Sequence, residues 1–393
     1  MSGPLAGYRI IDVTQMLSGP MATMILGDQG ADVIKVEPPT GDLTRSFGSN
    51  GLPPTFLMIN RNKRSVAINL KEPRGVELLK QMVADADVFV QNFRPGTVER
   101  MGIGDDDLRR VNPDLIYVSI SGFGESGPYV KKRVYDPVIQ ALSGLTDVQR
   151  DQETGRPHMM RLVIPDKVTS LTAAQAITAA LLARERTGKG QHVRLAMLDA
   201  VVSFVWPEGM AAQTIVRDDP RETAASEKRR DLLFETTDGF ITTGAMSNKE
   251  WEGLVRALEQ PQWLEDPRFQ TPASRMKNAG VRLELMAEVL KTRSSAEWLA
   301  RLDAEQVPCA PALRREEVMH NEQVIANKLI VESEHPHVGR TRMPRPPVRF
   351  EGTPAELRLP APALGEHTQA VLKEFGVSAE QLAELQAAGV VSG

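Results

Sequence analysis

The chain has 393 residues, of which 41% are hydrophobic and 25% charged, an ordinary composition for a globular protein of two or three domains. The net charge of −4 excludes general nucleic-acid binding by charge, so any anionic ligand must meet a local basic patch. One cysteine, Cys309, excludes an intrachain disulfide framework, and no run of about 18 apolar residues predicts a membrane span, so we expect a cytoplasmic protein without nucleic-acid or membrane partners.

Strands and helices alternate through the first part of the chain. Apolar runs predict strands at 9–13, 31–37, 65–70, 87–92, 115–121 and 191–195. Helices are predicted at 21–27, 73–84, 105–111, 169–185 and 197–204, the first two with proline at their entry. A helix between two strands implies parallel pairing, so the pattern predicts an open doubly wound, largely parallel, Rossmann-like α/β sheet.

The composition changes after residue 210. Nine of the fourteen residues in 217–230 are charged, which is typical of an exposed linker, and we place the linker at 211–224. A strand at 239–244 and amphipathic helices at 249–258, 282–291 and 295–303 predict a smaller α+β domain over 225–315. The segment 316–393, with an extended proline-rich stretch at 336–347 and a helix at 378–388, is expected to return to the large domain of residues 1–210.

Polar, glycine-bearing or basic turns follow five of the predicted strands. In an open α/β sheet, ligands bind beyond the carboxyl ends of the strands, so these turns predict a binding crevice. The first turn lacks G-x-G-x-x-G, and the chain has no P-loop motif, which argues against a dinucleotide. Basic residues crowd this half of the chain: Arg45, Arg61, Lys63, Arg64, Lys71, Arg94, Arg100, Lys131, Lys132 and Arg133. Their spacing fits equally a solvated loop at 60–64 and a site for a ligand with several phosphates.

Asp166 follows Pro165 just before the helix predicted at 169–185. Aspartate is a favoured N-cap residue, and the helix N-terminus stabilises negative charge. Position alone therefore predicts a capping carboxylate that is held ionised. The histidines are scattered without the spacing of metal ligands, so no metal site is predicted.

Several ordered segments, spread over nearly the whole chain, resemble the class III CoA-transferase family. This is the CaiB/BaiF group, whose members include formyl-CoA, succinyl-CoA and carnitine CoA-transferases. The matching segments include Ile11-Asp-Val-Thr14, Gly30-Ala-Asp-Val-Ile-Lys-Val-Glu37, Gly41-Asp-Leu-Thr-Arg45, Asn60-Arg-Asn-Lys-Arg-Ser65, Asn92-Phe-Arg-Pro-Gly96 and Thr187-Gly-Lys-Gly-Gln191.

The resemblance implies that Asp166 stands at the place of the family's catalytic nucleophile. It also implies an acyl-CoA and a carboxylic acid as substrates, no permanently bound cofactor, and a homodimer of two interlocked ring-like chains. Contacts with coenzyme A are implied at Leu17, Ser18, Pro38, Asn69, Lys71, Asn92, Phe93, Arg94, Arg100, Arg133, Tyr135 and Asp136. Leu17 and Pro38 replace a glutamine and an arginine of other members, so they would contribute backbone or apolar contacts. Residues 224–234 lack the glycine run with which some members cover the site, which implies a different lid or none.

The family scheme implies CoA transfer through aspartyl anhydrides and an aspartyl-CoA thioester on Asp166. Two alternatives stay open. An acyl-CoA racemase would need two acid/base groups, and Tyr135 occupies the place of the racemase histidine, where a phenol is a poor base at neutral pH. A CoA-ester-binding protein without transferase activity would keep the crevice and lack the chemistry.

Overall fold

The computed structural model describes residues 2–48, 50–151, 153–216 and 231–393, so the charged stretch 217–230 lies outside the described residues. The chain divides into two compact units, Met1–Thr223 with Leu329–Gly393, and Ala224–Lys328. Residues 316–328, expected to belong to the return segment, cluster with the smaller unit. Among the described residues, no helix is both long enough and apolar enough to cross a membrane.

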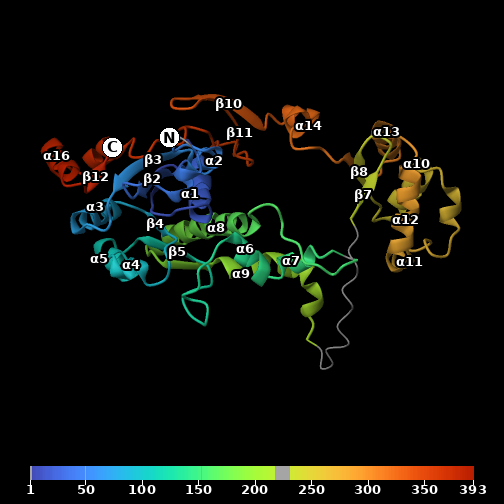
Figure 1. The fold of residues 1–393 in the computed structure, drawn as a ribbon, viewed down its shortest axis with the longest axis horizontal. Coiled ribbons are helices and arrows are strands. Elements are labelled where there is room, and N and C mark those ends of the chain that lie inside the picture. The colour runs from blue at the N-terminus through green and yellow to red at the C-terminus, as the bar shows by residue number, and fades with distance from the viewer. Residues whose placement is uncertain (1, 49, 152, 217–230) are drawn as a thin grey trace. The chain divides into compact units, whose positions relative to one another are not determined.

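A seven-stranded sheet forms the centre of the large unit, in the order β12-β3-β2-β1-β4-β5-β6 (Figure 1). All neighbouring pairs are parallel except β12 with β3. This confirms the largely parallel α/β sheet, with each predicted strand within two residues of its observed bounds. The strands are β1 (Arg9–Asp12), β2 (Asp32–Glu37), β3 (Lys63–Ile68), β4 (Val88–Gln91), β5 (Ile116–Ser121), β6 (His192–Ala196) and β12 (Val391–Ser392).

Helices cover both faces of this sheet. Successive strand residues point to opposite faces, so Ile10 packs in one core with Leu26 of α1, and Ile11 packs in another with Leu79 of α3. Both faces of the sheet are therefore buried, which explains why the strands are largely apolar. The first core lies under α1 (Ser18–Asp28) and α8 (Ile164–Thr187); the second lies under α3 (Pro73–Ala84), α5 (Asp105–Val111), α15 (Thr368–Glu374) and α16 (Ala379–Ala387).

Shorter elements complete the large unit. The proline-rich stretch 336–347, expected to be an extended return segment, overlaps the second strand of an antiparallel hairpin. Gly339, at φ +75°, begins the second hairpin strand, and Pro344 is its last residue. The remaining elements are α2 (Pro54–Asn60), α4 (Thr97–Arg100), α6 (Asp136–Leu142), α7 (Leu145–Val148), α9 (Met197–Gly209), β10 (Ile330–His335) and β11 (Gly339–Pro344).

The smaller unit is an α+β domain built around three tryptophans, Trp251, Trp263 and Trp298. Its α10 begins with a capping box in which Ser247 and Glu250 satisfy each other's backbone N–H groups. The three predicted helices are present, and the predicted strand pairs with two shorter ones. The elements are β7 (Leu233–Glu235), β8 (Phe240–Thr243), β9 (Cys309–Pro311), α10 (Asn248–Ala257), α11 (Pro272–Lys277), α12 (Ala279–Leu290), α13 (Ser295–Ala304) and α14 (Glu322–Ala326).

Candidate active site

Two neighbouring cavities lie at the carboxyl ends of the central strands, where the strand order reverses between β1 and β4. The Asp166 cavity has a volume of about 340 Å³, and the Pro38 cavity one of about 640 Å³. Gln15 and Leu43 line both of them. The Asp166 cavity is further lined by residues that follow β1, β4 and β5 and by the start of α8, among them Ser18, Asn92, Phe93, Arg94, Ser121, Gly122, Tyr135, Asp136 and Asp166.

Asp166 is the third residue of α8 and not its N-cap. The helix begins at Ile164, five residues earlier than predicted, because Pro165 occupies the second helical position, where proline is tolerated. The Asp166 N–H donates to Asp136 Oδ2 at 3.3 Å. The expected capping role is therefore wrong: Asp166 lies within the first turn of a helix that borders the cavity.

The surroundings of Asp166 work against its ionisation. Burial and then the nearby Asp136 carboxylate raise its pKa to about 6, although the hydroxyl and N–H of Ser18 act in the opposite direction. Ser18 is held against the helix because the Ser170 hydroxyl lies 2.7 Å from both the Ser18 and the Asp166 carbonyl oxygens. A helix start is expected to favour the ionised carboxylate, whereas the surroundings of Asp166 raise its pKa. The group is still ionised at pH 7 but is protonated more easily than an ordinary aspartate.

Asp136 uses both of its carboxylate oxygens within the protein. One accepts the Asp166 N–H, and the other accepts from Gln140 Nε2 at 2.6 Å. Burial raises the pKa of Asp136, although the hydrogen bonds from Gln140 and Asp166 and the charge of Lys167 lower it. Gln140 also lies 3.2 Å from the Leu162 carbonyl oxygen, so it ties α6 to the segment that leads into α8. Asp136 thus acts on the electrostatics of Asp166.

The sequence-predicted contact residues do not all lie together. Ser18, Asn92, Phe93, Arg94, Tyr135 and Asp136 line the Asp166 cavity. Leu17 is the N-cap of α1, and Pro38 lines the neighbouring cavity. Among the residues that the structure describes as lining the two cavities, Asn69, Lys71, Arg100 and Arg133 do not appear; the last three are exposed on the surface.

The prediction of a solvated loop at 60–64 is wrong. Arg61 pairs with Asp28 (2.7 Å), Lys63 with Asp12 (2.9 Å) and Arg64 with Asp32 (2.7 Å). These residues are therefore neither a solvated loop nor free to bind phosphates. Arg45 is likewise held by the Glu37 carboxylate through two contacts of 2.7 Å. Six of the ten basic residues named above are exposed at the surface: Lys71, Arg94, Arg100, Lys131, Lys132 and Arg133.

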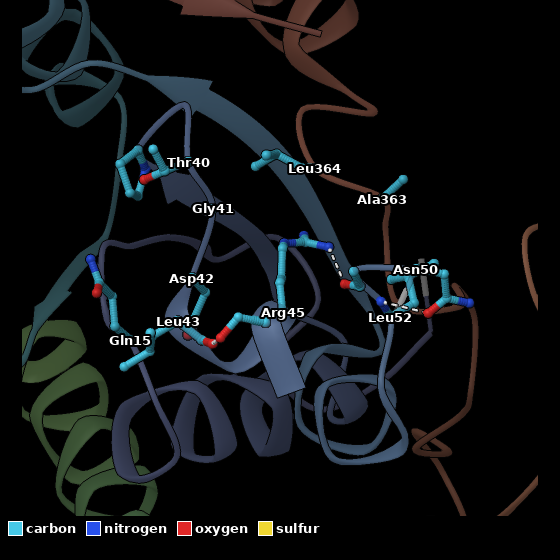
Figure 2. A pocket seen from close by; sticks show the side chains of 13 residues that line it. Gln15, Thr40, Gly41, Asp42, Leu43, Arg45, Asn50, Leu52, Ala363 and Leu364 are labelled. Carbon is cyan, nitrogen blue, oxygen red and sulfur yellow. Dashed lines mark hydrogen bonds between the residues drawn. The ribbon is translucent and has the colours of Figure 1, made fainter. Parts of the chain in front are cut away.

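Figure 2 shows the Pro38 cavity, with Gln15 and Leu43 on one side and Ala363 and Leu364 on the other. Arg45 lies between them, and its guanidinium also donates to the Gly51 and Pro362 carbonyl oxygens. Because this cation is neutralised by Glu37 and hydrogen bonded to the backbone, it forms part of the cavity wall.

The predicted contact set omitted other residues that line the Asp166 cavity, among them Gln15, Met16, Leu43, Lys132 and Met197. Gln15 and Met16 lie in the turn after the first predicted strand, and Lys132 lies in the basic run 131–133, so position gave a signal for these three. The Gly124 N–H, at the edge of this cavity, already donates to Ser121 Oγ at 3.0 Å.

The doubly wound sheet and the cavity at its strand-end crevice, which Asp166 lines, define a Rossmann-like α/β protein with a binding site at the switch point. The profile of CoA-transferase family III matches residues 5–368, and the chain belongs to this family. The chain is 36% identical to succinyl-CoA:glutarate CoA-transferase of Mus musculus, over 94% of this chain and 86% of that protein. It is 34% identical to formyl-CoA:oxalate CoA-transferase of Streptomyces coelicolor, over 98% and 99%.

The crystal structure of a CAIB/BAIF family protein from Brucella suis has the same fold, with a TM-score of 0.80. It shares 30% identity with this chain and covers 95% of it, while all of that chain is matched. The family membership expected from the ordered segments is therefore confirmed, and the protein is a class III CoA-transferase.

Proposed function

We propose that this enzyme moves CoA from an acyl-CoA thioester to a carboxylic acid, with Asp166 as the nucleophile. The observation that carries the proposal is the placement of Asp166: a carboxylate with a pKa of about 6 borders a cavity at the switch point of the sheet. A carboxylate that is poorly solvated yet ionised at pH 7 suits attack on a thioester carbonyl. The relatives named for glutarate and oxalate suggest a dicarboxylic acid as the acceptor.

The proposed reaction has four steps, each of which is a nucleophilic substitution at a carbonyl carbon. An Asp166 oxygen attacks the thioester carbonyl carbon and the C–S bond breaks, which gives a mixed anhydride and CoA thiolate. The thiolate attacks the Asp166 carbonyl of the anhydride, so the donor carboxylate leaves and an aspartyl-CoA thioester forms. The acceptor carboxylate attacks this thioester and releases the thiolate again. The thiolate then attacks the acceptor carbonyl of the second anhydride and restores the Asp166 carboxylate.

The chain's own residues would support these steps by position and charge. Ser18 holds the Asp166 carboxylate through its hydroxyl and N–H. Arg94 and Lys132 line the same cavity and suit the phosphates of CoA, and the exposed Lys71, Arg100 and Arg133 extend this basic set along the surface. Tyr135 is 63% exposed, so its ring is available to the ligand.

We also propose a homodimer, which light scattering would test.

Trapping of the acyl-enzyme tests the proposal. Incubation with succinyl-CoA followed by hydroxylamine should convert the Asp166 side chain into a hydroxamate, which peptide mass spectrometry would locate. Modification of another carboxylate, or none, would contradict the assignment. Deuterium incorporated at the α-carbon of a chiral 2-methylacyl-CoA in deuterated water would instead indicate a racemase.

Anhydride formation is expected to accelerate as the pH rises through about 6, because only ionised Asp166 attacks. Asp136→Asn should move the midpoint of this profile lower by about one pH unit, since the second largest cause of the raised pKa is lost while burial remains. The measurement is the pH dependence of kcat/KM. A midpoint that stays the same in Asp136→Asn would show that the Asp136 charge does not act on the nucleophile.

A further inference from the structure

The Thr14–Met16 turn between β1 and α1 is held by three side chains from other parts of the fold. Lys35 Nζ of β2 donates to the carbonyl of the first turn residue at 2.9 Å. The Asn92 amide, just after β4, accepts the N–H of the middle residue at 2.9 Å and donates to its carbonyl at 2.8 Å. Asp42 Oδ1 accepts the N–H of the last residue at 3.2 Å. Four main-chain groups of one short turn are therefore fixed by side chains.

The same turn combines buried charge with an unfavourable backbone conformation. Lys35 and Asp42 form a 3.0 Å ion pair with both side chains fully buried. Removing two charges from water is unfavourable unless further hydrogen bonds satisfy them. Here the turn supplies one bond to each charged group, and Thr44 donates two more to Asp42. Met16 has a φ of +68°, in the left-handed region that non-glycine residues rarely adopt. Such strain persists where surrounding contacts over-determine the conformation, and it concentrates at functional sites.

The turn leads directly to the nucleophile. Ser18, the first residue of α1, follows Met16 by two positions, and its hydroxyl and N–H interact with the Asp166 carboxylate. The Ser18 carbonyl oxygen lies 2.7 Å from Ser170 Oγ, one turn further along α8. A shift of the turn would therefore move both donors away from Asp166.

We propose that Lys35, Asp42 and Asn92 are positioning residues, which hold the Thr14–Met16 turn so that Ser18 stays against the Asp166 carboxylate. For Asn92, this gives the side-chain amide a role other than the expected contact with CoA. The expected loss of turnover rests on the proposed role of Asp166 as nucleophile. The expected change in the titration of the Asp166 carboxyl group does not depend on CoA transfer.

The other titratable groups around Asp166 define what the test must hold constant. Asp136 of α6 faces it directly, Lys167 follows it on α8, and Arg94, Lys132 and Tyr135 line the same cavity. The proposed variants change none of these groups, so a displaced titration of Asp166 would report the loss of the Ser18 donors.

The experiment compares the intact chain with the double variant Lys35→Met/Asp42→Leu, which removes both buried charges together, and with Asn92→Ala, a milder change at a half-buried residue. Carbodiimide labels protonated carboxyl groups, so labelling of Asp166 against pH, read by peptide mass spectrometry, gives its titration without turnover. We expect the midpoint to rise by about one pH unit in both variants. Turnover of succinyl-CoA should lose about 10- to 100-fold in kcat, with KM changed less than about threefold, as for a lost orientation of the nucleophile.

The matched control is Arg61→Met/Asp28→Leu, which removes a buried ion pair of 2.7 Å at the opposite end of the same helix, α1. It should leave the Asp166 titration unchanged. An unchanged titration in both the double variant and Asn92→Ala, or an equal displacement in the control, would overturn the positioning role. If the intact chain shows no CoA transfer but the variants still shift the labelling midpoint of Asp166, the positioning role is supported and the proposed function is contradicted.

Discussion

Asp166→Asn is expected to abolish CoA transfer and, at pH 7, to stabilise the fold. The amide cannot form the anhydride, so turnover should fall by at least about 10⁴-fold. Burial and Asp136 raise the pKa of Asp166 from 3.8 to about 6, which corresponds to roughly 3 kcal/mol against the ionised form. Because the side chain is only partly removed from water, we expect about 1–2 kcal/mol of this to appear as added stability.

The pH dependence distinguishes this effect from a general gain in packing. The folded protein binds the Asp166 proton more tightly than the unfolded chain does, so wild-type stability from this group is full below pH 4 and is lost as the pH rises through about 6. The advantage of the variant should therefore appear between pH 4 and 7 in urea unfolding. Asp106→Asn is the control, since Asp106 lies in the first turn of α5 but is exposed. If Asp166→Asn is less stable than wild type at pH 7, the ionised Asp166 carboxylate does not destabilise the fold and this prediction is wrong.

The sequence predicts those elements whose signal is local. The six parallel strands are short, largely apolar runs because both faces of the sheet are covered, and the predicted bounds of α3 and α5 match the observed ones. By contrast, β12 has two residues and exists through its pairing of Val391 with Ile68, which no local pattern records. The predicted start of α8 at residue 169 lies too late because the helix includes Pro165, and proline is compatible with the first turn of a helix.

The candidate site shows the same division. The strand-end turns that meet at the crevice follow from parallel topology, and Asp166 followed from the family resemblance. The fate of the basic residues could not be predicted, because it depends on partners that are distant in sequence. Lys63 and Asp12 are 51 residues apart, and only the tertiary fold shows that one neutralises the other. Likewise, the raised pKa of Asp166 comes from burial and from Asp136, 30 residues away.

Lys63→Met is expected to destabilise the large unit by about 3–5 kcal/mol, although Lys63 lines neither cavity described above. Its side chain is fully buried, and its ammonium group donates to Asp12 Oδ2 (2.9 Å), the Pro20 carbonyl (2.8 Å) and Asn60 Oδ1 (3.0 Å). Methionine fills a similar volume but leaves the fully buried Asp12 carboxylate without this partner. Urea unfolding at pH 7 would measure the loss. The control is Arg268, an exposed residue paired with Asp266, where Arg268→Met should change stability by less than about 1 kcal/mol.

The acid side of the stability profile should separate this loss of charge pairing from a loss of packing. Burial alone would raise the pKa of Asp12, but the charges of Lys63 and Lys35 outweigh it and lower that pKa to about 2. The stability from Asp12 is therefore full above pH 4 and is lost as the pH falls toward 2. In Lys63→Met, the unpaired carboxylate should take up a proton at higher pH, so the difference from wild type should shrink as the pH falls below 5. A difference that stays constant between pH 7 and 4 would mean that packing, and not the buried charge, accounts for the loss. Asp12→Leu/Lys63→Met should recover most of the stability, because replacing both members of a buried ion pair leaves no charge without a partner.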